Sequence, residues 1–142
     1  MATTFQVTFD SANPRSLAHF WTTVLGYVDQ PPPEGFSSWK EVLDQMGVPE
    51  KRWEDKYAII DPKAGGPRLL FQRVPEGKEA KNRVHLDVNV GEGLDGDARR
   101  ERVDEEVGRV TDLGATELYS MGEYGEYWVV MQDPEGNEFC LQ

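Results

Sequence analysis

The sequence is poor in the residues that cross-link a chain or give it positive charge. It has one cysteine, Cys140, and two histidines among 142 residues, so no disulfide can form within the chain and a zinc-finger cluster is excluded. Fifteen Lys and Arg stand against 26 Asp and Glu, a formal net charge of −11. Such an acidic surface repels phosphate backbones and anionic lipids, so we expect neither a nucleic acid nor a membrane as partner.

Long apolar runs are also absent. No stretch approaches the about 20 apolar residues that cross a bilayer, and residues 1–10 lack the basic and apolar regions of a signal peptide. A single cysteine agrees with a reducing compartment, and we expect a cytoplasmic protein. The length suits one domain covering residues 1–142. Fourteen glycines and nine prolines indicate many turns between short strands.

The first half begins with a strand and a helix. Phe5, Val7 and Phe9 alternate with polar residues, which predicts a strand with one apolar face. Asn13 can cap a helix whose first turn accepts Pro14, and Gly26 is placed to end it. Along this helix the apolar residues recur at i, i+3, i+4, i+7 and i+8, which predicts one buried stripe: Leu17, Phe20, Trp21, Val24 and Leu25.

Residues 30–56 read as an insertion that starts with three prolines. Ser38 and Glu41 form a capping-box pattern that predicts a short helix. We expect this helix to direct four apolar side chains inward: Trp39, Val42, Leu43 and Met46. Strands are predicted at residues 57–60 and 68–74, joined by a turn at 61–66.

The second half repeats the order of the first. Alternation predicts a strand over residues 84–90, and strands are also expected near 116–120, 127–132 and 138–142. A helix over 98–113 has an apolar stripe made of Val103, Val107, Val110 and Leu113. The acidic run 101–106 reads as the solvent face of that helix.

Matching turns support an internal repeat. Asp61-Pro62 and Asp133-Pro134 each follow a hydrophobic strand and precede another that ends at glutamine, and a Leu-Gly pair follows both helices. Both halves therefore read as βαβββ, an α+β pattern. The alternative is a single α+β domain in which these common turns coincide by chance.

The turn at residues 133–137, followed by a final hydrophobic strand, resembles the closing signature of the vicinal oxygen chelate superfamily of glyoxalase and bleomycin-resistance proteins. Residues 10–27 resemble the opening strand and helix of that superfamily, and in particular of its actinobacterial glyoxalase-like group. The resemblance implies one glyoxalase-like domain of two βαβββ modules with mixed sheets curling around a cavity. Module one covers about 5–74 with an insertion at 30–56, module two covers about 84–142, and such modules commonly associate as a homodimer.

Alternation also indicates which side chains face such a cavity. The face opposite the apolar residues carries three polar side chains on each of three strands: Gln6, Thr8 and Asp10; His85, Asp87 and Asn89; Glu138, Cys140 and Gln142. We expect ligand contacts from six of them: Gln6, Thr8, His85, Asp87, Glu138 and Cys140. The alternative is a polar face that only meets water.

Metal-dependent members of the superfamily carry His or Gln on the first strand of each module and Glu on the last strand. Gln6 and His85 match the first-strand positions, but Leu70 and Cys140 stand where the two glutamates belong. We therefore expect no metal and no cofactor. Because cysteine and histidine suit zinc, a relocated metal site stays open as an alternative.

The sequence assigns no catalytic residue; the best candidate is His85, with Asp87 orienting it as a general base or ligand donor. A structural histidine is the alternative. We expect a protein that binds a small organic molecule without a complete metal site, as a sequestering protein or a sensor. One alternative is a metal-dependent lyase, isomerase or ring-cleaving dioxygenase of the superfamily. Another is a protein that acts through its surface, with a vestigial cavity.

Overall fold

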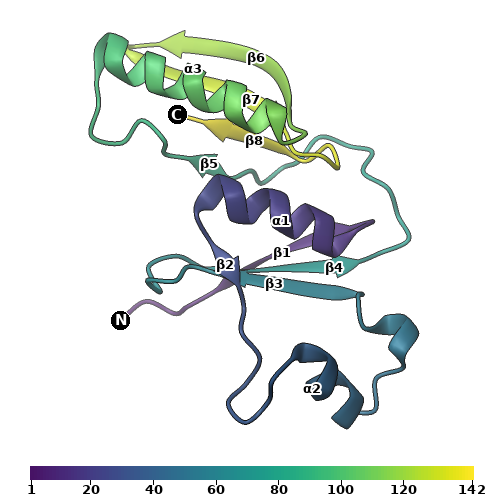
Figure 1. The fold of residues 1–142 in the computed structure, drawn as a ribbon. Coiled ribbons are helices and arrows are strands. Elements are labelled where there is room, and N and C mark those ends of the chain that lie inside the picture. Colours follow the sequence, from purple (N-terminus) through teal and green to yellow (C-terminus); the bar gives the residue numbers. More distant parts are fainter. The chain divides into compact units, whose positions relative to one another are not determined.

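The computed structural model describes all residues 1–142 and divides them into two compact units, 1–77 and 78–142 (Figure 1). Each unit contains a four-stranded mixed sheet and a helix that packs on it, which confirms the α+β class. The unit boundary falls between the two predicted modules. No strand of one sheet pairs with a strand of the other.

The first unit has the strand order β1-β4-β3-β2. β1 pairs with β4 in parallel, and the other pairings are antiparallel. The two-residue strand β2 was not predicted, and the expected insertion lies between β2 and β3. The elements are β1 (Gln6–Ser11), α1 (Pro14–Leu25), β2 (Val28–Asp29), α2 (Trp39–Gln45), a 3₁₀ turn (Glu50–Arg52), β3 (Lys56–Ile60) and β4 (Arg68–Arg73).

The second unit has the equivalent strand order β5-β8-β7-β6, again with one parallel pair, β5 and β8. Thr8 lies opposite Leu70 in the first unit, and Asp87 lies opposite Cys140 in the second. This shared register confirms the internal repeat. The elements are β5 (Asp87–Val88), α3 (Gly96–Asp112), β6 (Thr116–Glu123), β7 (Glu126–Gln132) and β8 (Glu138–Leu141).

Local signals fix the first helix as the sequence predicts. The Asn13 side chain accepts a hydrogen bond from the Ser16 amide at 3.3 Å, and Gly26 ends α1 with a left-handed φ of 71°. The buried stripe of α1 packs on β3 and β4, and each large side chain there contributes about 1.5–3 kcal/mol of burial. This core consists of Leu17, Ala18, Phe20, Trp21 and Val24 of α1 with Ile59, Leu69 and Phe71 of the sheet.

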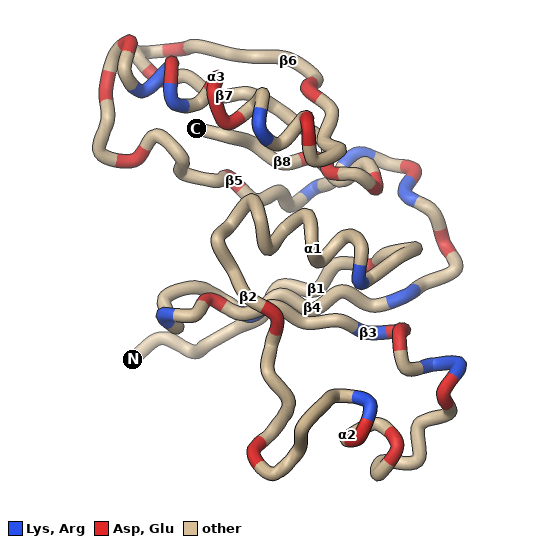
Figure 2. Tube along the Cα trace, in the orientation of Figure 1, with Lys and Arg blue, Asp and Glu red and all other residues tan.

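The second helix confirms its apolar stripe but corrects the reading of its acidic run. Val103, Val107 and Val110 are buried, whereas Leu113 is exposed because it lies after the last turn. Glu106 is only 2% exposed, so it does not belong to the solvent face. Arg102 Nη1 lies 3.0 Å from its carboxylate, and Arg109 donates to both of its oxygens. Figure 2 shows the alternating charges along α3, in contrast to α1.

The predicted strand over 84–90 is wrong in extent, since only Asp87 and Val88 form ladder pairs. Upstream, the Asn82 amide bonds to the Glu138 side chain instead of a strand neighbour. Val84 is therefore 83% exposed and lies outside the core, although its place in the alternation of residues 84–90 predicts an inward side chain. Phe5, at the same place before β1, is also exposed.

The predicted inward face of the insertion helix is partly wrong. The helix begins after Ser38, whose hydroxyl accepts from the Glu41 amide at 3.2 Å as expected. Only Val42 is buried, while Trp39 and Met46 are exposed, the latter at 71%. Trp39 instead donates its indole N–H to the Gln30 carbonyl at 2.7 Å, so it fastens the helix to the chain after β2.

The two Asp-Pro turns are built alike. Asp61 accepts from the backbone amides of Lys63 and Gly65 at 2.8 and 3.0 Å, and Asp133 accepts from those of Glu135 and Asn137 at 2.9 and 3.0 Å. The bonds thus span two and four residues in both turns. They differ in burial, because Asp133 is 2% exposed and Asp61 is half-buried.

β6 is the long edge strand of the second sheet and pairs only with β7. All eight of its residues are exposed, including Leu118, Tyr119 and Met121. A register shift between Glu117 and Tyr119 interrupts its ladder. Among the helices of the protein, none combines the length and apolar character that membrane crossing requires.

Candidate functional site

The second unit brings three of the predicted residues together on the polar face of its sheet. His85 precedes β5 by two residues, Asp87 begins β5, and Cys140 lies opposite Asp87 on β8. Their potential ligand atoms all lie within 4.8 Å of one another. His85 and Asp87 point away from the apolar side of the sheet because alternation directs Leu86 and Val88 the other way.

Asp87 links the other two side chains. His85 Nδ1 lies 2.7 Å from Asp87 Oδ1, and since a carboxylate can only accept, Nδ1 donates to Asp87. The Cys140 thiol also hydrogen-bonds to Asp87. Burial, followed by the Asp87 charge and this hydrogen bond, raises the pKa of the Cys140 thiol to about 11. The cysteine is therefore a neutral donor at pH 7 rather than a nucleophile, and the bond to Asp87 leaves the other ring nitrogen of His85, Nε2, for a ligand.

Glu138 lies on the same face, but its carboxylate is already engaged. Lys78 Nζ is 3.1 Å from Oε2, and the Asn82 amide donates to the same oxygen at 3.0 Å. Burial raises the pKa of Glu138, yet the hydrogen bonds from Asn82 and Lys78 outweigh it and hold the pKa below its usual range. The residue thus ties the segment before β5 to β8.

The polar face of the first unit is organised around an arginine that the sequence did not single out. Arg68 Nη1 donates to Gln6 Oε1 and Arg68 Nε to Gln30 Oε1, each at 2.9 Å. Gln6 in turn donates to the Thr8 hydroxyl at 3.3 Å. The predicted pair Gln6 and Thr8 therefore shares one hydrogen-bonded network with Arg68.

Part of this network was readable from the sequence. Arg68 lies two residues from Leu70 on a predicted strand, so alternation places both on one face. Nothing in the sequence pairs Gln30 with Arg68, because the contact spans 38 residues across an insertion. The contact depends on the backbone path directly after β2, which places the Gln30 side chain beside Arg68.

The residues present do not fit the four-ligand metal centre that the superfamily resemblance implies. Gln6 Oε1 already accepts from a guanidinium, whose positive charge opposes a bound cation. Leu70 has no ligand atom, and Cys140 holds its proton far above neutral pH. A hard divalent ion requires several oxygen ligands that neutralise its charge. Leu70 and Cys140, which stand where the superfamily carries its two glutamates, supply neither carboxylate.

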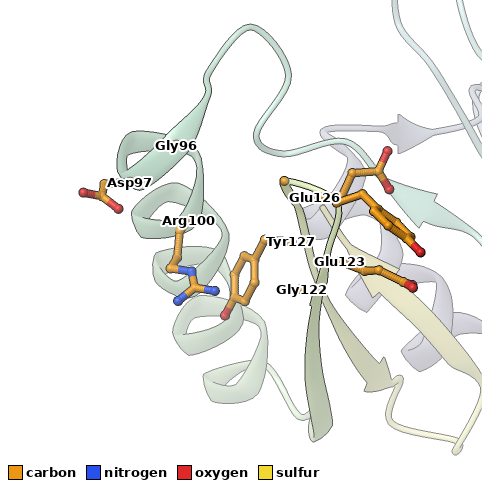
Figure 3. A pocket seen from close by; sticks show the side chains of 9 residues that line it. Gly96, Asp97, Arg100, Gly122, Glu123, Glu126 and Tyr127 are labelled. Carbon is orange, nitrogen blue, oxygen red and sulfur yellow. The ribbon is translucent and has the colours of Figure 1, made fainter.

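A separate hollow of about 330 Å³ opens between the start of α3 and the β6–β7 hairpin (Figure 3). The Arg100 guanidinium lies over the Tyr127 ring, 4.3 Å from its centre, and the Tyr127 hydroxyl donates to Asp104. Acidic side chains, Asp97 and Glu126 among them, line the hollow. None of the predicted ligand residues lines the hollow. The contacts of Tyr127 with Arg100 and Asp104 hold the β6–β7 hairpin against α3.

Comparison with known proteins agrees with this fold. A family model described as a glyoxalase-like domain matches residues 6–142. No curated protein sequence matches the chain. Among solved structures, a glyoxalase/bleomycin resistance protein/dioxygenase family enzyme from Burkholderia phytofirmans is 16% identical with a TM-score of 0.63, over 96% of this chain and 94% of that one.

Two further structures extend the comparison. A mutant of the fosfomycin resistance protein FosX from Listeria monocytogenes, complexed with Mn(II) and 1S,2S-dihydroxypropylphosphonic acid, is 12% identical with a TM-score of 0.64, over 100% of this chain and 90% of that one. A protein described as a possible glyoxalase from Bacillus cereus is 12% identical with a TM-score of 0.63, over 100% and 99%. At these identities the likeness concerns the fold alone.

Proposed function

Because the chain belongs to the glyoxalase-like domain family, we propose that it binds a small organic molecule on the polar faces of its sheets without a complete metal site. The observation that carries this proposal is the pair of residues at the equivalent last-strand positions, Leu70 and Cys140, which the shared register identifies. Neither offers a carboxylate. The polar faces nevertheless keep ordered donors and acceptors, which supports retention of binding after loss of the metal ligands.

In this proposal the His85–Asp87 pair supplies the recognition chemistry of the second unit. Asp87 accepts from Nδ1 and so orients the imidazole, and in the neutral form of the ring Nε2 accepts a hydrogen bond from a ligand hydroxyl or amide. A protein of this kind sequesters its ligand or senses it, and we place it in the cytoplasm. Sequestration and sensing require binding alone, without chemical conversion of the ligand.

Two measurements on the freshly purified full chain test the proposal. Native mass spectrometry should show an organic adduct that denaturation releases, and elemental analysis after dialysis should show well under one equivalent of any divalent metal. An adduct lost in His85→Ala but kept in His19→Ala supports the site, because His19 is the only other histidine and lies on α1. A stoichiometric metal, or no adduct under any growth condition, contradicts it.

One observation favours a second function. The His85, Asp87 and Cys140 atoms lie close enough together to approach one ion, and zinc accepts all three residue types. A metal-dependent lyase, isomerase or dioxygenase would then use a relocated centre. Zinc titration followed by native mass spectrometry distinguishes the two: this alternative requires one tightly bound zinc that Cys140→Ser removes.

A further inference from the structure

Arg68 is the exception among the arginines of the first unit. That unit contains four, and the other three each form an ion pair: Arg15 with Glu54, and Arg52 and Arg73 with Asp55. Arg68 is half-buried, and the hydrogen-bond partners of its guanidinium are two neutral amide oxygens. In a chain with 26 acidic residues and 15 basic ones, a guanidinium without a carboxylate partner is conspicuous, since burial of an unpaired charge costs free energy.

The two glutamines hold this guanidinium in a fixed orientation. Gln30 is anchored through its backbone, which donates to the Ala58 carbonyl at 3.0 Å and accepts from the Trp39 indole at 2.7 Å. Gln6 lies directly opposite Arg68 in the parallel ladder. Two separate segments therefore orient one side chain, and little conformational entropy remains to be lost when a ligand binds it.

The remaining donors suit an oxyanion. A guanidinium has five N–H groups, and the contacts to Gln6 and Gln30 use two of them. Those left include both hydrogens of Nη2 and one of Nη1, the edge that pairs with two oxygens of a carboxylate or phosphonate. The Thr8 hydroxyl and the half-buried Leu70 follow on the same face, offering a polar and an apolar contact beside that edge.

We propose that Arg68 recognises the carboxylate or phosphonate group of the small organic ligand. This inference rests on the proposed function and names the chemical class of its ligand. Because the protein as a whole repels anions at a net charge of −11, binding of an anion at this face depends on the local cation. The glutamines neutralise no charge, so they orient Arg68 and leave its attraction for an anion intact.

Four probes of one size test the charge requirement on the full chain: benzoate, phenylphosphonate, neutral benzamide and cationic benzylamine. Chemical-shift titrations in ¹H–¹⁵N spectra should show saturable shifts at the amides of β1 and β4 and at the Arg68 Nε–H with an anion. Benzamide and benzylamine should bind at least about tenfold more weakly. The stronger of the two anions identifies the oxyanion class.

Variants then assign the effect to the residue. Arg68→Gln should weaken anion binding about tenfold or more, and Arg68→Lys should retain part of it because the charge remains without the planar pair of donors. Arg73→Gln is the matched control, an ion-paired arginine on the same strand. If Arg68→Gln loses its folded spectrum, Arg68→Lys and the wild-type probe series still decide the question.

Equal affinity for benzoate and benzamide, or anion binding unchanged in Arg68→Gln, overturns the inference. Shifts that do not saturate also overturn it. The experiments distinguish this inference from the proposed function. Loss of the native adduct in His85→Ala, but not in Arg68→Gln, would support the proposed binding function and exclude Arg68 from the site. An adduct that persists in both His85→Ala and Arg68→Gln would exclude both residues from the binding site.

Discussion

His85 and Asp87 form a directed pair, with Nδ1 of the imidazole 2.7 Å from Oδ1 of the carboxylate and both side chains about two-fifths exposed, at 42% and 41%. The pair lies at the start of an edge strand, so its partners come from its own segment and from β8 rather than from a packed layer. Such a pair can be removed without opening the core. Its loss should therefore affect binding more than folding.

We expect His85→Ala to abolish or strongly weaken binding of the copurifying molecule while changing the free energy of unfolding by no more than about 0.5 kcal/mol, the usual range for exposed sites. Thermal unfolding run beside a ligand titration measures both quantities, with His19→Ala as control. A large drop in melting temperature with unchanged affinity would identify His85 as structural.

Cys140 should react slowly with iodoacetamide at pH 7 and faster as the pH rises towards 11. Its thiol pKa is raised to about 11 by burial and by Asp87, and only the thiolate attacks. Asp87→Asn removes the negative charge, so it should lower the pKa and speed alkylation at a given pH. Mass spectrometry of the single cysteine follows the rate, and an Asp87→Asn rate equal to wild type would contradict the assigned cause.

Glu106→Ala should destabilise the protein by about 1–2 kcal/mol, because the ion pairs with Arg102 and Arg109 are lost but the partly exposed arginines regain water. Burial raises the pKa of Glu106, yet Arg109 and Arg102 outweigh it and the net pKa is lowered. Its contribution to stability is therefore present above the unfolded pKa of about 4.3 and is lost as the pH falls through the lower folded value.

Urea unfolding between neutral and acidic pH measures this contribution, with Glu105→Ala as the control. Glu105 is a neighbour on the same helix whose side chain is 79% exposed. The difference in stability between Glu106→Ala and wild type should shrink as the solution is acidified. A difference that is the same at every pH would mean that packing, not the ion pair, is responsible.

The two Asp-Pro turns provide a matched pair for a second stability test. Asp133→Ala leaves the part-buried amides of Glu135 and Asn137 without the acceptor that the buried Asp133 provides, and should cost about 1–3 kcal/mol. Asp61→Ala removes equivalent bonds at a turn whose amides reach water, so the same change should cost less. Equal losses in chemical denaturation would show that burial does not set the cost.

We also propose that the protein is a homodimer, the commonest symmetric form among soluble oligomers. Light scattering coupled to gel filtration should give twice the chain mass of 16.1 kDa. A monomer mass across the accessible concentration range would reject the proposal.

Prediction from sequence succeeded where a signal is local. Asn13 and Gly26 bound α1 as expected, and the Asp-Pro turns fixed the repeat and with it the equivalence of Leu70 and Cys140. Alternation correctly placed His85 and Asp87 on the exposed face. These inferences required only the preferences of a cap, a turn or a strand for particular residues.

The failures came where a residue's environment depends on distant segments. Val84 alternates like a core residue, but pairing ends before it reaches a covering layer. Glu106 reads as a surface acid, and only its two flanking arginines make its burial tolerable. The bond between Gln30 and Arg68 joins residues on either side of an insertion, and periodicity carries no information about such a contact.

Because β6 is an exposed edge strand, the tendency of this protein to aggregate should depend on its net charge. An eight-residue edge that displays Leu118, Tyr119 and Met121 is a template on which a second molecule can add a strand. At neutral pH a net charge of −11 keeps such edges apart. Near the isoelectric point of about 4.6 that repulsion vanishes, so acidic buffers should promote strand-to-strand precipitation before they unfold either unit.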